Sequence, residues 1–230
     1  MPRTLLLGAV LAGGRSTRMG RCKAELPHES GGTFLDHALE QLAACCDHVA
    51  CSLAADAAEP TRGSVSSTGG NIADRSTIRT RDGESFQDTG CSANPLPPGV
   101  VVIVDEVPDR GPVEGVCGAV ELANSLGCAG VLVTAVDLPA LNATHLQHLI
   151  SVFSDAPDRV VVAISDDVAV KKRIQPLVAI YPVALQGDLQ ALAGSAHRSL
   201  YRFLEGVDCC FVELPAGVLH NVNSPHDLRV

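Results

Sequence analysis

The sequence predicts an α/β protein with a mostly parallel β-sheet covered by helices. Short apolar runs bounded by turn residues recur along the chain, and helical patterns lie between them. Several of these runs end in an acidic residue or lead into glycines, as at the ligand-binding edge of open parallel sheets. We expect strands at residues 4–11, 48–53, 100–105, 130–136, 160–164, 177–181 and 209–212.

Helices are expected between these strands. Residues 33–44 place Phe34, Leu35 and other apolar side chains on one face, and residues 142–152 open with Asn142, which can accept the free amides of a first helical turn. A further helix is expected after the glycine-rich segment 110–118. Ser224 followed by proline predicts a short C-terminal helix.

Length and composition favour one domain over residues 1–230. A chain of 230 residues that is 46% hydrophobic can bury one sizeable core. Residues 54–98 break the pattern, because they are rich in Gly, Ser, Thr, Asp and Pro and carry few large apolar side chains. Such a segment cannot bury enough apolar surface to order itself. We expect a flexible insertion there.

Charge and cysteine content limit the partners and the compartment. The net charge of −9 disfavours nucleic acid and membrane surfaces, since both require clustered positive charge. No apolar run reaches the length of a membrane helix, and the first residues do not form a typical leader. The nine cysteines form no C-x-x-C pair, and their odd number favours buried free thiols in a reducing compartment. A cytoplasmic location is expected.

The first expected strand leads into a basic, glycine-rich segment. Residues 11–23, Leu-Ala-Gly-Gly-Arg-Ser-Thr-Arg-Met-Gly-Arg-Cys-Lys, combine three glycines with four cations. Glycines let backbone N–H groups approach an anion closely, and the cations neutralise phosphate charge. The segment matches neither the Walker A motif nor the dinucleotide fingerprint. It predicts a triphosphate site, the alternative being an ordinary exposed turn.

Carboxylates at strand ends predict a metal site. An apolar strand leads to Asp137, and another ends at Asp105. Mg²⁺ in nucleotide enzymes is typically held by one or two carboxylates together with phosphate oxygens and water. Asn223 can add an amide oxygen. The alternatives are that Asp137 caps the next turn and that Asn223 caps the C-terminal helix.

Taken together, these motifs resemble the molybdenum cofactor guanylyltransferase family, the MobA-type enzymes. That resemblance implies a three-layer, Rossmann-like nucleotidyltransferase fold with a mostly parallel sheet. Leu-Ala-Gly-Gly in the first loop is similar to the guanylyl branch, whereas cytidylyl enzymes usually have Leu-Ala-Ala-Gly. The motifs that carry the resemblance are 11–23, 111–115 (Gly-Pro-Val-Glu-Gly), 137–139 (Asp-Leu-Pro), 175–177 (Gln-Pro-Leu) and 221–225 (Asn-Val-Asn-Ser-Pro).

The resemblance also implies roles for individual residues. Lys23, Arg18 and Asp137 are the expected catalytic residues, and Asp137 and Asn223 are the expected Mg²⁺ ligands. The sequence departs from the family pattern at Cys22, where Asp is frequent, and at Ser52, where Asn is frequent. The residues expected to bind the nucleotide are Leu11, Ala12, Gly13, Gly14, Lys23, Ser52, Asp105 and Asp137.

The activity implied by the resemblance is transfer of GMP from GTP to the phosphate of molybdopterin, the organic part of the molybdenum cofactor, with release of pyrophosphate. Molybdoenzymes or cofactor-delivery proteins are further expected partners. One alternative is a nucleotidyltransferase that uses CTP on molybdopterin or acts on a sugar phosphate. Another is a catalytically silent GTP-binding protein, which the departures at Cys22 and Ser52 would favour.

Overall fold

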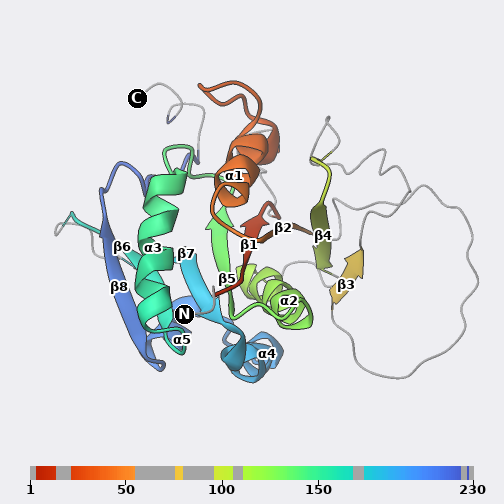
Figure 1. The fold of residues 1–230 in the computed structure, drawn as a ribbon, viewed down its shortest axis with the longest axis vertical. Coiled ribbons are helices and arrows are strands. Elements are labelled where there is room, and N and C mark those ends of the chain that lie inside the picture. The colour runs from red at the N-terminus through yellow and green to blue at the C-terminus, as the bar shows by residue number, and fades with distance from the viewer. Residues whose placement is uncertain are drawn as a thin grey trace, which may run out of the picture.

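An eight-stranded sheet forms the centre of the computed structural model (Figure 1). The structure describes residues 4–13, 22–54, 76–79, 96–105, 111–167, 174–223 and 227. The strands lie side by side in the order β3-β4-β2-β1-β5-β7-β6-β8. Their bounds are β1 (Leu6–Leu11), β2 (His48–Ala54), β3 (Ser76–Arg79), β4 (Val100–Asp105), β5 (Gly130–Ala135), β6 (Val160–Ser165), β7 (Ile174–Pro182) and β8 (Cys209–Leu214).

The sheet is mostly parallel, as the sequence predicts. β1 runs parallel to both β2 and β5, β2 runs parallel to β4, and β6 runs parallel to β8. Only β3 and β7 run antiparallel to their neighbours within the described sheet. The carboxyl ends of β1, β2, β4 and β5 therefore lie at one edge.

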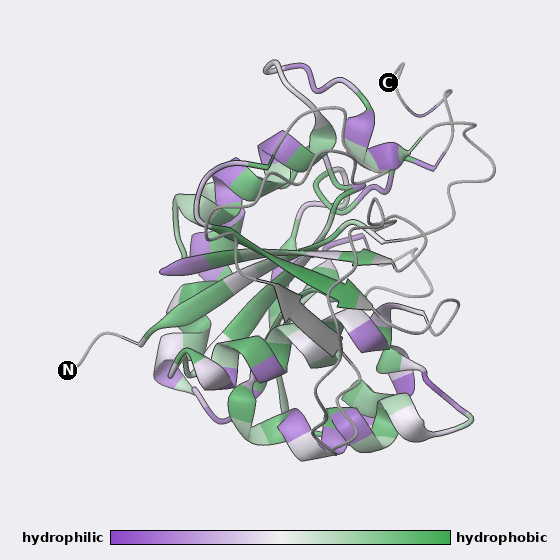
Figure 2. Cartoon of the chain, turned by 90° about the vertical axis from the view of Figure 1, so that its right-hand side faces the viewer, coloured by the Kyte–Doolittle hydropathy of each residue, from purple (hydrophilic) through white to green (hydrophobic). Residues whose placement is uncertain are grey.

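Helices cover both faces of the sheet, which confirms the predicted three-layer α/β fold. The apolar sides of α1 and α3 pack on one face with Leu132, whereas α2, α4 and α5 pack on the other with Val133. Figure 2 shows the apolar strands enclosed between the helical layers. The helices are α1 (Phe34–Ala43), α2 (Pro112–Ser125), α3 (Ala143–Asp155), α4 (Gln186–Gly194) and α5 (Leu200–Glu205), with short 3₁₀ turns η1 (Lys23–Glu25) and η3 (Val183–Leu185).

Side-chain caps explain where the two predicted helices begin. The Thr33 side chain accepts a hydrogen bond from Asp36 N, and Asp36 Oδ2 accepts one from Thr33 N at 2.9 Å. Asn142 Oδ1 accepts hydrogen bonds from the amides of Thr144 and His145 at the start of α3. These bonds satisfy amides that lack partners within the helix.

Among the helices that the structure describes, none has the length and apolar content needed to cross a membrane.

Each strand expected from the sequence is present, with small differences in its ends. β7 is longer than expected because its first residues pair with the end of β6 after a register shift between Val162 and Ala163. Neither α4 nor α5 was expected from the sequence. The expected C-terminal helix falls on residues 224–230, which lie outside the described part of the chain except for Asp227.

A short strand that the sequence did not predict lies within the expected insertion. β3 pairs antiparallel with β4, placing Ser76 opposite Asp105 and Arg79 opposite Val102. Its four residues lie in a polar region, too short for an alternation of apolar side chains to stand out. Residues 55–75 and 80–95 lie outside the described part, so the flexible insertion and the single domain stay predictions.

The cysteines that the structure describes are all free thiols, in agreement with the sequence. Cys51, Cys117 and Cys128 are buried. Burial raises the pKa of Cys51 to about 12, with the charge of Cys22 adding to the effect. A thiol with such a high pKa is not a nucleophile near neutral pH. Cys51 therefore contributes to packing in the middle of β2 and not to covalent catalysis.

Candidate active site

Four parallel strands bring their carboxyl ends to one edge of the sheet. β1 pairs in register with its neighbours, so Leu11 lies beside Ser52 on one side and Ala135 on the other. β4 extends this arrangement beyond β2 and ends at Asp105. Ligands of open α/β sheets bind beyond the carboxyl ends of the strands. Leu11, Ser52 and Asp105 thus share the edge at which Asp137 follows β5.

The first turn of α2 packs directly on the ends of β1 and β2. A Cβ atom on Gly115 would lie 2.7 Å from Ser52 Oγ and 2.9 Å from Leu11 Cδ2, which is closer than real Cβ contacts. Ala12 N donates a hydrogen bond to Ser52 O at 2.9 Å, which fixes the chain leaving β1 against β2. The exposed Gly13 follows. The structure therefore gathers Leu11, Ala12 and Ser52 beside the N-terminus of α2.

Lys23, Asp137 and Asn223 come together although they are far apart in the sequence. Lys23 Nζ donates hydrogen bonds to Asp137 Oδ2 at 2.8 Å and to Asn223 Oδ1 at 2.7 Å. The side chains of Lys23 and Asp137 are 19% and 14% exposed, so water screens this ion pair only partly. The contact brings three of the predicted site residues within reach of one ligand.

The segment that carries Asn223 is fixed to the turn after β5. Val222 N donates a hydrogen bond to Asp137 O at 2.9 Å, and Asn221 Nδ2 lies 3.5 Å from both carboxylate oxygens of Asp137. Val222 itself is buried in the core. Asn221 and Asn223 therefore flank the Asp137 carboxylate from a segment anchored by its apolar middle residue.

The donor set at Asp137 suits a divalent cation. The Lys23 ammonium shows that one carboxylate oxygen and one amide oxygen can meet at a single positive charge. In the ranges that the structure describes, no group of three or more His, Cys, Asp or Glu side chains could hold a metal alone. A metal here would therefore need oxygens from a substrate and water, which is how Mg²⁺ is bound in nucleotide enzymes. Asp137 and Asn223 fit that arrangement.

Three of the expected site residues are only partly placed or not placed. Gly14 and Arg18 lie outside the described part of the chain. The backbone of Asp105 ends β4 at the shared edge, but its side chain is outside the description. The expected roles of these three residues stay predictions.

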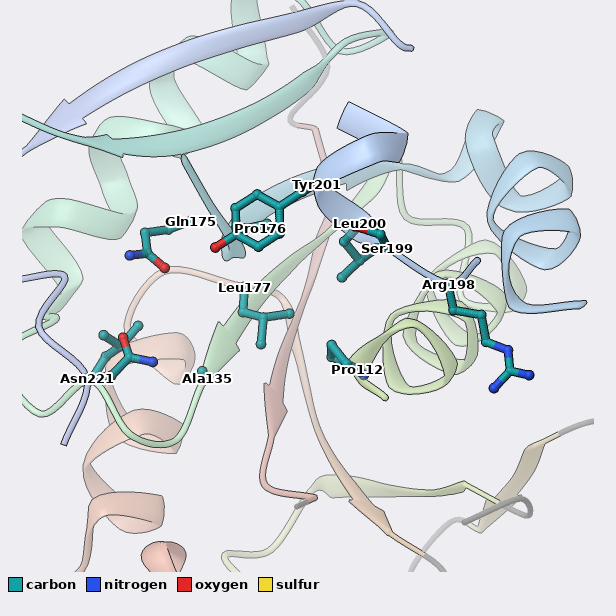
Figure 3. Close-up of a pocket in the computed structure, with 11 residues that line it drawn as sticks. Pro112, Ala135, Gln175, Pro176, Leu177, Arg198, Ser199, Leu200, Tyr201 and Asn221 are labelled. Atoms are coloured by element: carbon teal, nitrogen blue, oxygen red, sulfur yellow. The ribbon is translucent and has the colours of Figure 1, made fainter. Parts of the chain in front are cut away.

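A cavity of about 270 Å³ adjoins Asp137. Two of its lining residues, Leu138 and Asn221, flank Asp137 in sequence or in space. Figure 3 shows Gln175 and Asn221 on one side of the pocket and Arg198 on the other, with Leu177 between them. The lining residues are Pro112, Ala135, Leu138, Gln175, Pro176, Leu177, Arg198, Ser199, Leu200, Tyr201 and Asn221.

Part of this pocket was not foreseen from the sequence. Tyr201 comes from α5 and Arg198 from the segment before it, and only the tertiary fold brings them to the pocket that Gln175 lines. Asn221 was within the motif 221–225 that the sequence already singled out, two residues before Asn223. No local signal marked Arg198 or Tyr201.

Residues 8–209 match the MobA-like NTP transferase domain. The chain belongs to the MobA-like NTP transferase family. It is a nucleotidyltransferase, as the site at the carboxyl edge of the sheet suggests. This membership confirms the resemblance carried by the motifs and fits the three-layer fold described above.

Individual relatives agree with the family match. The chain is 40% identical over 224 residues to a probable molybdenum cofactor guanylyltransferase of Rhodopirellula baltica, covering 97% of this chain and 90% of that protein. The fold is similar to that of molybdopterin-guanine dinucleotide biosynthesis protein A from Archaeoglobus fulgidus, with a TM-score of 0.63 and 17% identity over 97% of this chain and 95% of the other.

A second similar structure contains manganese. It is the Mycobacterium tuberculosis protein Rv0371c in complex with manganese, with a TM-score of 0.54 and 18% identity over 92% of this chain and 89% of the other. At this level of identity the likeness shows a shared MobA-like fold. It also shows that one protein of this fold is compatible with a divalent cation.

Proposed function

We propose that the protein transfers GMP from GTP to the phosphate of molybdopterin, forming molybdopterin guanine dinucleotide and pyrophosphate. The observation that carries the proposal is the position of Lys23 between Asp137 and Asn223 at the carboxyl edge of the sheet. The 40% identical relative named as a probable molybdenum cofactor guanylyltransferase supports this choice of substrates.

The nucleotide would bind beyond the ends of β1, β2 and β4. Leu11, Ala12 and Gly13 lead from β1 towards the basic segment, and Ser52 is held beneath the first turn of α2. A helix N-terminus carries a partial positive charge that favours a nearby anion. This arrangement supports nucleotide binding through backbone groups at the strand ends.

Asp137 and Asn223 would hold Mg²⁺ beside the triphosphate. The metal would neutralise charge on the phosphate oxygens. Lys23 now neutralises Asp137, and its ammonium can turn towards a triphosphate because the residue remains partly exposed. There it would stabilise the charge that accumulates on the leaving pyrophosphate. Together with Arg18, whose position is a prediction, Lys23 would align the α-phosphate for attack.

The acceptor would occupy the pocket that Gln175, Arg198 and Tyr201 line. A phosphate monoester is already ionised near neutral pH, so its oxygen needs no strong general base. Catalysis then depends on alignment and charge neutralisation. The pocket supports this placement of the acceptor because two of its lining residues, Leu138 and Asn221, flank Asp137, where the two substrates would meet.

The test is pyrophosphate release by the purified protein with molybdopterin, Mg²⁺ and GTP, CTP or UTP in separate reactions. We expect pyrophosphate release in the reaction with GTP and none in the reactions with CTP or UTP. Release with CTP alone, or with a sugar phosphate in place of molybdopterin, would assign the protein to another branch of the family. GTP binding by calorimetry without any release would identify a silent nucleotide-binding protein.

The proposal extends to the setting of the reaction. The free thiols suit a reducing compartment, which supports the cytoplasm as the site of the activity. The dinucleotide product would then pass to molybdoenzymes or cofactor-delivery proteins. Copurification of tagged protein with such a partner from cytoplasmic extract would test both points.

A further inference from the structure

Two histidines stack face to face close to the candidate active site. The ring centroids of His28 and His37 lie 3.8 Å apart, and the ring planes are inclined by 10°. His28 belongs to the turn before α1, and His37 lies on α1. Phe34 meets His28 edge-on, with centroids 5.9 Å apart. The stack therefore joins α1 to the turn that follows Lys23.

Both rings face the segment 137–141, which follows β5. His28 Nε2 lies 3.0 Å from Pro139 O, and His37 Nε2 lies 3.0 Å from Leu141 O. A carbonyl oxygen only accepts hydrogen bonds, so each Nε2 carries the hydrogen. The Ser30 amide donates to His28 Nδ1 at 3.1 Å, which requires that nitrogen to be an acceptor. His28 is therefore the neutral Nε2–H tautomer.

These bonds connect the two segments that supply Lys23 and Asp137. The Lys23 segment is itself fixed by backbone bonds, because Leu26 N donates to Lys23 O at 3.1 Å and Phe34 N donates to Leu26 O at 2.9 Å. The ion pair of Lys23 with Asp137 joins the segments at one end. The two imidazoles join them at the other.

A third bond extends the same connection along α1. Ala143 N, at the start of α3, donates to Gln41 Oε1 at 2.9 Å. His37 and Gln41 are one helical turn apart, so they lie on the same face of α1. The backbone of segment 137–143 is thus attached to α1 and the preceding turn at three successive points.

We propose that His28 and His37 are positioning residues that set Asp137 at its working distance from Lys23. The inference rests on the proposed function, in which Lys23 and Asp137 act on the same triphosphate. Neither imidazole touches the reacting groups, and each acts through a backbone carbonyl of segment 137–141. A small displacement of an aligned catalytic group lowers the rate strongly.

The test compares variants that separate the hydrogen bond from the ring. His37→Phe keeps an aromatic ring for the stack but removes the Nε2–H donor, whereas His37→Gln keeps an N–H donor and loses the ring. His28→Phe and His28→Gln form a second pair. His148→Phe, at an exposed position on α3, is the matched control.

For each Phe variant we expect kcat to fall about fivefold and KM for GTP to change less than twofold. The fivefold figure corresponds to the net free energy of about one hydrogen bond. The Gln variants should recover most of the rate. If the histidines contributed only to stability, the variants would have a lower melting temperature but no fall in kcat at constant KM. All rates are therefore compared at a temperature where every variant is folded.

Acylation of Lys23 by an N-hydroxysuccinimide ester, followed by peptide mass spectrometry, measures the same positioning without turnover. The ion pair with Asp137 protects the Lys23 amine, so faster labelling is expected in His37→Phe and near wild-type labelling in His37→Gln. Wild-type labelling in both Phe variants would overturn the proposal. A loss of rate that Gln does not restore would also overturn it.

The two readouts distinguish the failure of this inference from the failure of the proposed function. If the wild type released no pyrophosphate with any nucleotide, the proposed function would fail. The difference in Lys23 labelling between the Phe and Gln variants would still decide whether the imidazoles position Asp137.

Discussion

The ammonium nitrogen of Lys23 lies 2.8 Å from Asp137 Oδ2, in an ion pair that joins residues 114 positions apart. Asn223 Oδ1 accepts a second hydrogen bond from the same nitrogen at 2.7 Å. The Lys23 ammonium thus lies where a metal ion held by Asp137 and Asn223 would lie. Binding of substrate with Mg²⁺ would exchange one cation for another at this point.

Replacement of Lys23 by alanine should lower kcat/KM for GTP by about 100-fold, the typical cost of removing one preorganised charge donor. Both GTP binding and rate should suffer, because the ammonium neutralises charge that grows on the leaving pyrophosphate. Calorimetry with GTP and pyrophosphate release would measure the two effects. Wild-type kinetics in Lys23→Ala would remove this residue from the site.

The Asp137→Asn variant should lose metal-dependent turnover while keeping its fold. The amide is nearly the same size as the carboxylate, but it carries no charge for a divalent cation. Pyrophosphate release should be measured as a function of Mg²⁺ concentration. Asp158→Asn, at an exposed turn before β6, is the control and should behave as wild type. Equal Mg²⁺ dependence in both variants would contradict the assigned role.

Local sequence was enough to predict the strand ends. It was also enough to select Lys23, Asp137 and Asn223 as candidate site residues. A buried parallel strand is an apolar run, and its carboxyl end lies at the ligand edge whatever the rest of the fold. Asp137 could therefore be selected without coordinates, whereas Lys23 was selected from the basic segment after β1 and from the family resemblance. Their direct contact could not be predicted, because it depends on how the turn before α1 lies against the turn after β5.

The stacked histidines show what sequence reasoning lacks. His28 and His37 stand nine positions apart, and they meet because the chain reverses at Gly31 and Gly32, where φ is +97° and +69°. His28 N donates to Gly32 O at 3.0 Å across this turn. Nothing in the spacing of two histidines predicts that both rings face one backbone segment.

Gly115→Ala should destabilise the protein by about 1–3 kcal/mol, the usual cost of overpacking. The added methyl group would collide with Ser52 Oγ and Leu11 Cδ2 and push α2 away from the strand ends. KM for GTP should rise as well, because those residues border the proposed nucleotide site. Urea denaturation would measure stability. Gly187→Ala in α4 is a matched control, since a Cβ there meets no atom within 4 Å.

Thr134→Val should stabilise the protein by about 1 kcal/mol. Thr134 is 2% exposed, and in the described part of the chain its Oγ1 is buried without a hydrogen-bond partner. Removing an unsatisfied buried hydroxyl from a strand avoids its desolvation cost. The exposed Thr144→Val change on α3 should alter the free energy of unfolding by less than about 0.5 kcal/mol. Equal effects of the two changes would show that Thr134 has a partner.

Acidification should weaken the fold through His37. Burial lowers the pKa of His37 below its usual 6.5, repulsion from a protonated His28 would lower it further, and the Leu141 carbonyl and Glu40 oppose this shift. Because the folded state holds the neutral imidazole, the unfolded chain binds the proton more readily. This contribution to stability is fully present above about pH 6.5 and is lost as the pH falls below it. Urea titrations at pH 7.5 and 5.5 should therefore show a smaller loss of stability in His37→Gln than in the wild type, because glutamine does not titrate. An identical pH dependence of the two proteins would show that His37 titrates alike in the folded and unfolded states. The stacked imidazole would then make no pH-dependent contribution to the free energy of unfolding.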